Sequence, residues 1–193
     1  VQIVNNVITD STSAAIYLAG AERIQIKGNT ITGDEGYIRD DGGNSHYFTI
    51  HDNSFKGMEC NNSDSGSIAD NTSYGEIKIA YCDHIVIDGN TVTNGNMGIR
   101  LLSMNVNATI TSNTVTNNDW LGIYVGGSDH VVSNNIVNNN GGTSTASASP
   151  PYGGIIVEGA SNITLTGNTA NNNNQCGIYV SNQGHTVSGN TAT

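Results

Sequence analysis

The chain has 193 residues and a formal net charge of −10, from 16 acidic and 6 basic side chains. This length suits one domain, and the scarcity of Lys and Arg excludes a nucleic-acid groove, which needs clustered cations. No run of 18 apolar residues occurs, so we expect no membrane span. The low charged fraction of 11% and the abundant Asn are also typical of disordered chains, but the periodicity of the sequence decides against disorder.

The predicted elements begin with one coil of short strands. Residues 7–9, 16–18 and 24–26 each alternate apolar with polar side chains, and turn-type residues separate them. Such alternation in runs of three to five residues predicts half-buried strands. Residues 30–32 then repeat the pattern of 7–9, so one coil takes about 23 residues.

The same three strands return along the whole chain. They recur at residues 48–50, 85–87, 91–93, 99–101, 114–116, 123–125, 155–157, 163–165 and 178–180. This repeat predicts an all-β fold, a single-stranded parallel β-helix solenoid of about eight or nine coils, with residues 1–193 as one domain and no required helix. One longer repeat contains Gly-Gly and Pro-Pro pairs, which predicts a loop excursion at about residues 141–152.

An asparagine marks one turn of each coil. It occurs at Asn6, Asn29, Asn53, Asn71, Asn90, Asn113, Asn135, Asn168 and Asn190. A turn of this kind needs a positive φ, which Asn tolerates better than most residues with a side chain. Stacked coils would place these side chains above one another, so we expect their amides to form a ladder of hydrogen bonds.

Repeats such as residues 24–32 and 85–93 resemble those of the right-handed parallel β-helix superfamily, which includes pectate lyases, alginate epimerases, polygalacturonases, phage tailspikes and copper-associated periplasmic repeat proteins. The resemblance covers essentially the whole chain and implies a right-handed solenoid. It implies no single activity, because this scaffold carries many chemistries. The Asp-Pro-His motif of the epimerases is missing, and so is the Gly-His-Gly motif of the polygalacturonases, since Gly184 and His185 precede Thr186.

Lyases of this superfamily combine a Lys or Arg base with carboxylates that hold Ca²⁺ or neutralise a uronate. The resemblance therefore implies catalytic candidates at Arg39, Asp40, Asp41, Lys78, Asp83 and Arg100. Counting from the recurrent asparagines places Asp64 at the offset of Asp40, with Asp83 nearby, so these acids would form a column with about 4.8 Å between coils. Such a column suits an acid–base pair or calcium bound by Asp40, Asp41 and Asp64. Alternatively, these acids cap turns and keep the surface soluble.

The outward position of the third strand carries a row of basic and aromatic side chains. Its members are Tyr17, Arg39, Lys78, Arg100, Tyr124, Ile156 and Tyr179. Aromatic faces beside Arg or Lys donors suit sugar rings, acidic glycans or a protein partner. Ordinary cross-strand pairing accounts for the row equally well, because Tyr is a good strand residue.

The three cysteines give a weaker signal. Cys60 and Cys82 lie about one coil apart, so a disulfide between them is conceivable in a secreted compartment. Cys176 is interpreted as structural. A zinc site is not expected, because no Cys-x-x-Cys pair is present.

Three functions remain open from the sequence. The preferred hypothesis is a non-enzymatic structural protein, extracellular or at the cell surface, that stacks end to end with a second copy into a filament or forms part of a longer β-helix. Residues 1–4 and 178–193 are as repeat-like as the interior coils and lack the Lys and Pro that usually protect a strand edge. The alternatives are a polysaccharide lyase, epimerase or hydrolase, and a glycan-binding module similar to part of a tailspike, both with polysaccharide as the partner.

Overall fold

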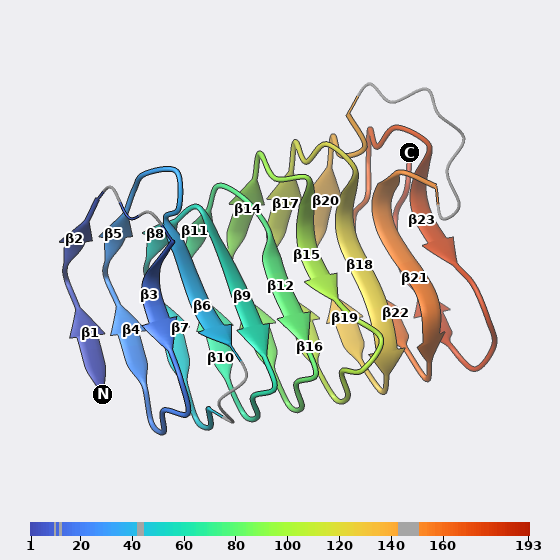
Figure 1. The fold of residues 1–193 in the computed structure, drawn as a ribbon. Coiled ribbons are helices and arrows are strands. Elements are labelled where there is room, and N and C mark those ends of the chain that lie inside the picture. Colours follow the sequence, from blue (N-terminus) through green and yellow to red (C-terminus); the bar gives the residue numbers. More distant parts are fainter. Residues whose placement is uncertain (10, 12, 42–44, 143–150) are drawn as a thin grey trace.

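The computed structural model describes residues 1–9, 11, 13–41, 45–142 and 151–193. These residues wind into a parallel β-solenoid whose coils follow one another from the N-terminus to the C-terminus (Figure 1). Each complete coil contributes one strand to each of three parallel sheets, which we call A, B and C. The all-β fold predicted from the repeat is confirmed, and no helix occurs in the described part of the chain.

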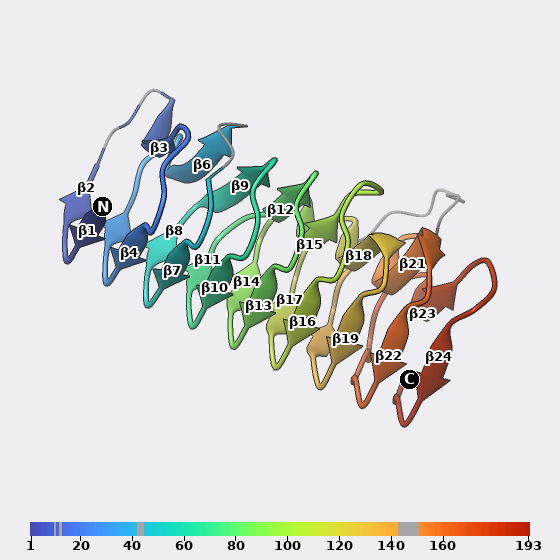
Figure 2. The same ribbon diagram turned by 90° about the horizontal axis from the view of Figure 1, so that it is seen from below.

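The three sheets run along the solenoid, and the strands of sheet A lie side by side in Figure 2. Sheet A contains β1 (Gln2–Val4), β4 (Gln25–Lys27), β7 (Thr49–His51), β10 (Ser67–Ala69), β13 (Val86–Asp88), β16 (Thr109–Thr111), β19 (Val131–Ser133), β22 (Thr164–Thr166) and β24 (Thr186–Ser188). Sheet B contains β2 (Val7–Ile8), β5 (Thr30–Ile31), β8 (Ser54–Phe55), β11 (Thr72–Ser73), β14 (Thr91–Thr93), β17 (Thr114–Thr116) and β20 (Ile136–Asn138). Sheet C contains β3 (Ala14–Leu18), β6 (Tyr37–Asp41), β9 (Gly57–Asn61), β12 (Ile77–Ala80), β15 (Met97–Leu101), β18 (Leu121–Ser128), β21 (Gly153–Ser161) and β23 (Cys176–Val180).

The interior consists of aliphatic columns that cross the coils. In sheet A the parallel register places Ile50 beside Ile26 and Ile68, and Ile87 beside Ile110. All five side chains are fully buried. Because burying an Ile side chain contributes about 1.5–3 kcal/mol, and a slip of one residue would turn it toward solvent, these columns fix the register of neighbouring coils.

The predicted asparagine ladder is present and buried along most of its length. A typical rung is Asn90, whose Nδ2 donates to the carbonyls of Ile68 (2.9 Å) and Asp88 (3.0 Å) and to Oδ1 of Asn113 (2.9 Å). Its own Oδ1 accepts bonds from the backbone and side-chain amides of Asn71, both at 3.0 Å. The ladder therefore satisfies polar groups that the turn would otherwise bury without partners.

The expected backbone conformation of the ladder asparagines was wrong by one position. The positive φ occurs at the preceding residue, for example Asn5 (57°), Asp52 (58°) and Gly89 (65°), and at none of the nine ladder asparagines. The preceding residue makes the sharp bend, so the ladder residue is free to place its amide inside the coil. Asn is required at the rung for its donors and acceptor rather than for its tolerance of the left-handed region.

A second, shorter ladder lies between sheets B and C. Nδ2 of Asn118 donates to Oδ1 of Asn140 (2.9 Å), and Nδ2 of Asn140 donates to Oδ1 of Asn173 (3.1 Å). The repeat pattern in the sequence did not predict this second ladder. Most of the predicted loop excursion at 141–152 lies outside the described residues, because 143–150 are not described. No helix among the described residues is long and apolar enough to cross a membrane.

Candidate functional site

The outward row on sheet C forms one continuous column. Strand register aligns Tyr17, Arg39, Glu59, Lys78, Arg100, Tyr124, Ile156 and Tyr179 on successive strands. We call this column the sheet C stripe. It contains all seven side chains predicted from the sequence, together with Glu59, which the sequence analysis missed. Ile156 differs from the expectation, because its side chain is fully buried instead of exposed.

Glu59 links two cations of the stripe. Its carboxylate lies 3.5 Å from Nε of Arg39 and forms an ion pair with Nζ of Lys78. Burial tends to raise the pKa of Glu59, but the hydrogen bonds from Lys78 and Asn61 and the charges of Lys78 and Arg39 together hold this pKa below its ordinary value. Glu59 is therefore ionised, and its carboxylate accepts a hydrogen bond from Nζ of Lys78.

Arg100 has its own carboxylate beside the stripe. Its Nη2 donates a hydrogen bond to Oε2 of Glu76 at 3.0 Å, and its Nε lies in ion-pair contact with Oε1 of the same carboxylate. Burial nevertheless raises the pKa of Glu76, outweighing the favourable charge of Arg100. The Glu76 carboxylate is therefore easier to protonate than that of Glu59, whose pKa is lowered.

Tyr124 is the next member of the stripe after Arg100. Burial, the negative charge of Glu158 and a hydrogen bond to Glu158 all raise the pKa of the Tyr124 phenol. The phenol is therefore protonated at neutral pH and acts as a hydrogen-bond donor. Tyr17, at the other end of the stripe, exposes 57% of its surface and offers an open aromatic face.

The electrostatics of this face differ from the sequence-based expectation of a basic row. Three cations occupy the stripe, and carboxylates of Glu59, Glu76 and Glu158 lie beside its members. The face is therefore balanced in charge, with paired donors and acceptors between aromatic rings. Such a surface suits a ligand rich in hydroxyl groups, because each hydroxyl both donates and accepts.

The predicted carboxylate column is wrong in one member. Asp40 lies inside the coil, where it is buried and in register with Cys60. Asp64 lies at the corner between sheets C and A, where the chain bridges from His46 through Asp64 to Asp83. The reason is that Asp40 belongs to β6 whereas Asp64 follows β9. The same number of residues after a ladder asparagine therefore leads to different places in the two coils.

This placement separates the predicted catalytic and metal residues. Arg39 faces outward and Asp40 inward on the same strand, so the two side chains cannot act on one ligand. Nδ1 of His46 lies 3.7 Å from Oδ2 of Asp64 at the corner, away from the buried Asp40. Among the residues described, no group of three or more His, Cys, Asp or Glu side chains is arranged to hold a metal ion.

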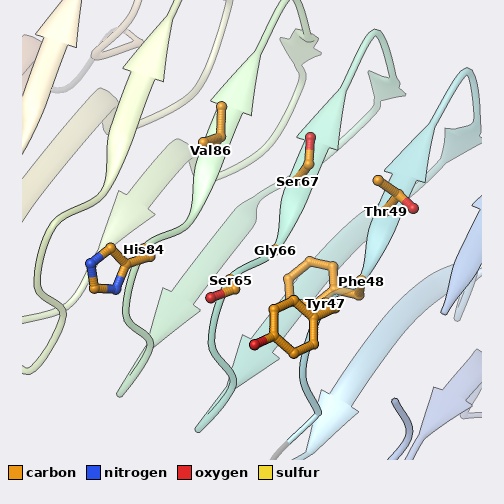
Figure 3. Close-up of a pocket in the computed structure, with 8 residues that line it drawn as sticks. All are labelled: Tyr47, Phe48, Thr49, Ser65, Gly66, Ser67, His84 and Val86. Atoms are coloured by element: carbon orange, nitrogen blue, oxygen red, sulfur yellow. The ribbon is translucent and has the colours of Figure 1, made fainter. Parts of the chain in front are cut away.

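A hollow of about 440 Å³ opens at the corner that leads into sheet A (Figure 3). Tyr47 and His84 flank it, with Gly66 between them. A Cβ on Gly66 would lie 2.0 Å from Cζ of the buried Phe48 ring, so only glycine fits over that ring. Tyr47 and His84 both adopt a positive φ, which is uncommon for a residue as bulky as Tyr, and both side chains are exposed. No pattern in the sequence predicted this hollow.

Known proteins share the fold of the whole chain. The family described as the right-handed β-helix region matches residues 1–150 and 37–193. The chain belongs to this family. The right-handed coil expected from the resemblance is thereby confirmed. No curated protein sequence matches the chain.

Several solved structures share this β-helix. An alginate lyase from Paenibacillus sp. str. FPU-7 superposes with a TM-score of 0.71 at 17% identity, covering 98% of this chain and 75% of the lyase. A surface adhesin of Streptococcus pneumoniae gives a TM-score of 0.68 at 15% identity, covering all of this chain and 61% of the adhesin. An endopolygalacturonase from Stereum purpureum gives 0.55 at 15% identity, covering all of this chain and 67% of the enzyme. At these identities the likeness establishes the fold alone.

Proposed function

We propose that this β-helix binds a polysaccharide along the sheet C stripe. The observation that carries the proposal is the unbroken run of Arg39, Glu59, Lys78, Arg100 and Tyr124 on five successive strands. Adjacent strands lie about 4.8 Å apart, so the run offers a regular series of donors and acceptors to an extended chain of sugars. The similar structures include an alginate lyase and an endopolygalacturonase, which supports a ligand of this class.

The same groups favour binding over catalysis. Proton abstraction from a sugar needs a side chain with a free basic form. In the stripe, the ammonium of Lys78 is paired with Glu59 and the guanidinium of Arg100 with Glu76. The raised pKa of Tyr124 keeps its phenol protonated. We therefore propose a binding protein, in an extracellular or cell-surface setting where polysaccharides are found.

Retention on immobilised polysaccharides tests this proposal. The panel contains two polyuronates, alginate and polygalacturonate, and two neutral chains, dextran and cellulose. We expect retention that changes little between low and high salt, because the stripe is balanced in charge and hydroxyl contacts dominate. Lys78→Gln and Tyr124→Phe should each weaken retention, whereas Lys27→Ala, which removes an ion-paired lysine from sheet A, should leave it unchanged.

Three results would contradict the proposal. Retention on none of the four polysaccharides would remove the ligand class. Equal retention of Lys78→Gln and Lys27→Ala would place the binding surface elsewhere. Release of unsaturated uronate products from alginate or polygalacturonate would replace the binding function with lyase activity.

We also propose that copies of the chain assemble by stacking end to end. In the described structure β1 pairs only with β4, and β24 only with β22, so each outermost strand of sheet A has one unpaired edge. The ladder also has a direction, since in its side-chain pairs, from Asn6–Asn29 to Asn168–Asn190, Nδ2 of one rung donates to Oδ1 of the rung on the next coil. Head-to-tail stacking would therefore bring the Asn190 donor of one copy to the Asn6 acceptor of the next, a heterologous contact that builds a filament.

Negative-stain electron microscopy across a concentration series tests the stacking. We expect filaments with an axial repeat of roughly 40 Å, from eight to nine coils of about 4.8 Å. Val4→Lys and Ile178→Lys should block them by placing a charge in the contact. Isolated rods at every concentration would instead mean that these edges pair with further coils of a longer protein or remain open.

A further inference from the structure

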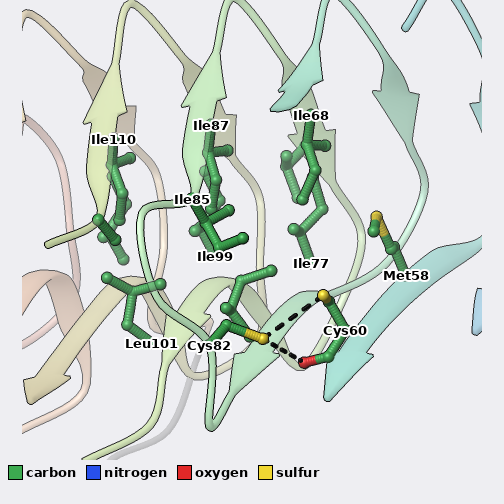
Figure 4. Packing of buried hydrophobic residues seen from close by; sticks show 14 of the residues in the cluster. Met58, Cys60, Ile68, Ile77, Cys82, Ile85, Ile87, Ile99, Leu101 and Ile110 are labelled. Atoms are coloured by element: carbon green, nitrogen blue, oxygen red, sulfur yellow. Dashed lines mark hydrogen bonds between the residues drawn. The ribbon is translucent and has the colours of Figure 1, made fainter. Parts of the chain in front are cut away.

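Two buried thiols from neighbouring coils lie within reach of each other (Figure 4). Cys60 points inward from β9 and is fully buried, whereas Cys82 lies in the turn after β12 and is 2% exposed. Their sulfur atoms are 3.5 Å apart, and Cys82 Sγ is also 3.5 Å from the Cys60 carbonyl oxygen. Both are free thiols in this structure.

Their surroundings are unusually polar for the centre of a coil. Asp40 lies beside Cys60 in the same inward column, with its Oδ2 atom 4.0 Å from Cys60 Sγ. Ser45 donates a hydrogen bond to Oδ1 of Asp40 at 3.0 Å, and the Ser63 hydroxyl donates to Oδ2. Further along, the same column holds aliphatic side chains at Ile79, Leu101, Val125 and Val157. An aliphatic column needs no such cluster, so packing alone does not explain it.

The two thiols differ in acidity. The pKa of Cys82 is lowered, first by the hydrogen bond it shares with the Cys60 thiol and further by hydrogen bonds with the backbone of Ser63 and Ala80, which together outweigh the effect of burial. The pKa of Cys60 is raised by that bond, by burial and by the Asp40 carboxylate. Cys82 is therefore the member that becomes a thiolate first, and thiolates are the reactive form.

We propose that Cys60 and Cys82 are an oxidation site, at which a small peroxide converts them into a disulfide that joins two adjacent coils. The sulfur atoms must approach from 3.5 Å to about 2.05 Å. Cys82 can make this movement, because it lies in a turn outside β12 and follows the exposed Tyr81. Hydrogen peroxide is among the smallest oxidants, and Cys82, at 2% exposed, is the more accessible of the two thiols.

The reaction balances in two steps. The Cys82 thiolate attacks one peroxide oxygen, the O–O bond breaks, and the departing hydroxide takes a proton to leave as water, which leaves a sulfenic acid on Cys82. The Cys60 sulfur then attacks the Cys82 sulfur, the S–O bond breaks, and the departing hydroxide takes the Cys60 proton to form a second water. Two thiols lose two hydrogen atoms and two electrons in total, and one peroxide is reduced to two waters.

Peptide mapping tests this proposal on the full chain. Trypsin cuts after Lys56, Lys78 and Arg100, so Cys60, Cys82 and Cys176 fall in three different peptides, 57–78, 79–100 and 101–193. The folded protein is treated with hydrogen peroxide, catalase removes the peroxide, and N-ethylmaleimide then alkylates free thiols in denaturant. We expect peptides 57–78 and 79–100 to be joined and to separate on reduction, with peptide 101–193 unlinked.

Variants and a second measurement make the result decisive. Cys176→Ser should form the same link, whereas Cys60→Ser should form none and leave a Cys82 sulfenic acid that dimedone captures. Closing this loop of about 20 residues should raise Tm by roughly 6–12 °C relative to the reduced protein. Full alkylation of both cysteines after peroxide, a sulfinic acid on Cys82 without a link, a link to Cys176, or a link with no rise in Tm would each overturn the proposal.

Discussion

Replacing Asn113 by Ala removes one complete rung from the middle of the asparagine ladder. The side chain is fully buried. Its Nδ2 donates to the carbonyls of Ile87 (2.9 Å) and Thr111 (2.8 Å) and to Oδ1 of Asn135 (3.0 Å). Its Oδ1 accepts bonds from the backbone amide and from Nδ2 of Asn90, both at 2.9 Å. Because Nδ2 carries only two hydrogens, its three contacts share two N–H groups, so the substitution deletes about four full hydrogen bonds.

The expected loss follows from these bonds. A buried hydrogen bond contributes about 1 kcal/mol net, so four of them give about 4 kcal/mol. Oδ1 of Asn135 keeps a partner, because the backbone amide of residue 113 still donates to it at 2.9 Å. The backbone amide of Asn90 keeps none, and a buried donor without a partner costs about 1–3 kcal/mol. These two corrections oppose each other, so we expect Asn113→Ala to lower the free energy of unfolding by about 4–5 kcal/mol.

Urea unfolding followed by far-ultraviolet circular dichroism measures this loss. The matched control is Asn96→Ala, at an exposed position where the described structure shows no hydrogen bond from the side chain. Surface changes of that kind stay within about 0.5 kcal/mol. If Asn113→Ala lost no more than Asn96→Ala, the ladder would be a consequence of the fold and not a source of its stability.

Three further predictions use the same unfolding assay. The pKa of Glu76 is raised in the folded protein, so its contribution to stability is fully present below the ordinary value of 4.5 and is lost as pH rises through the raised pKa. Glu76→Gln should therefore remove this fall in the free energy of unfolding with rising pH. The pKa of Glu59 is lowered in the folded protein, so Glu59 stabilises the fold above pH 4.5 and loses this effect as pH falls through the lowered pKa. Glu59→Gln should therefore flatten the acid side of the plot of unfolding free energy against pH. An unchanged plot in either variant would contradict the direction given for that pKa shift. Gly66→Ala places a Cβ 2.0 Å from the Phe48 ring and should cost about 1–3 kcal/mol by overpacking; an unchanged urea midpoint would show that the ring moves freely.

The repeat pattern predicted the stripe because periodicity carries register. Tyr17, Arg39, Lys78 and Arg100 follow the same apolar residue in each third strand, and parallel stacking then places them in one column. Register of this kind is strongly determined, since a shift of one residue would expose every buried Ile of the strand. The sequence was therefore a sufficient guide wherever a strand was flanked by recognisable apolar positions.

The sequence was a poor guide to turns and to partners. Intervals between ladder asparagines vary from 18 to 33 residues, so counting from them misplaced Asp40 relative to Asp64. Glu59 was missed because its strand contains Met58 and Cys60 in place of the usual Ile pair. The pairing of Glu76 with Arg100 also depends on how a turn brings a side chain back over the sheet, which local pattern does not specify.

Partly buried ion pairs are a weak source of stability. If the charges of the sheet C stripe serve binding, their removal should therefore cost the fold little, whereas charges that serve the fold should cost it much. Arg39, Glu59 and Lys78 expose only 39%, 22% and 28% of their side chains, so folding removes part of their hydration. Replacing such groups by well-packed, less polar residues is often neutral or stabilising, and threonine already occupies the outward positions of β14 and β17. We therefore expect the triple variant Arg39→Thr, Glu59→Thr and Lys78→Thr to unfold at the same or higher urea concentration and to lose retention on polysaccharide. A variant destabilised by several kcal/mol would show instead that these charges serve the fold, and the case for a binding face on sheet C would fail.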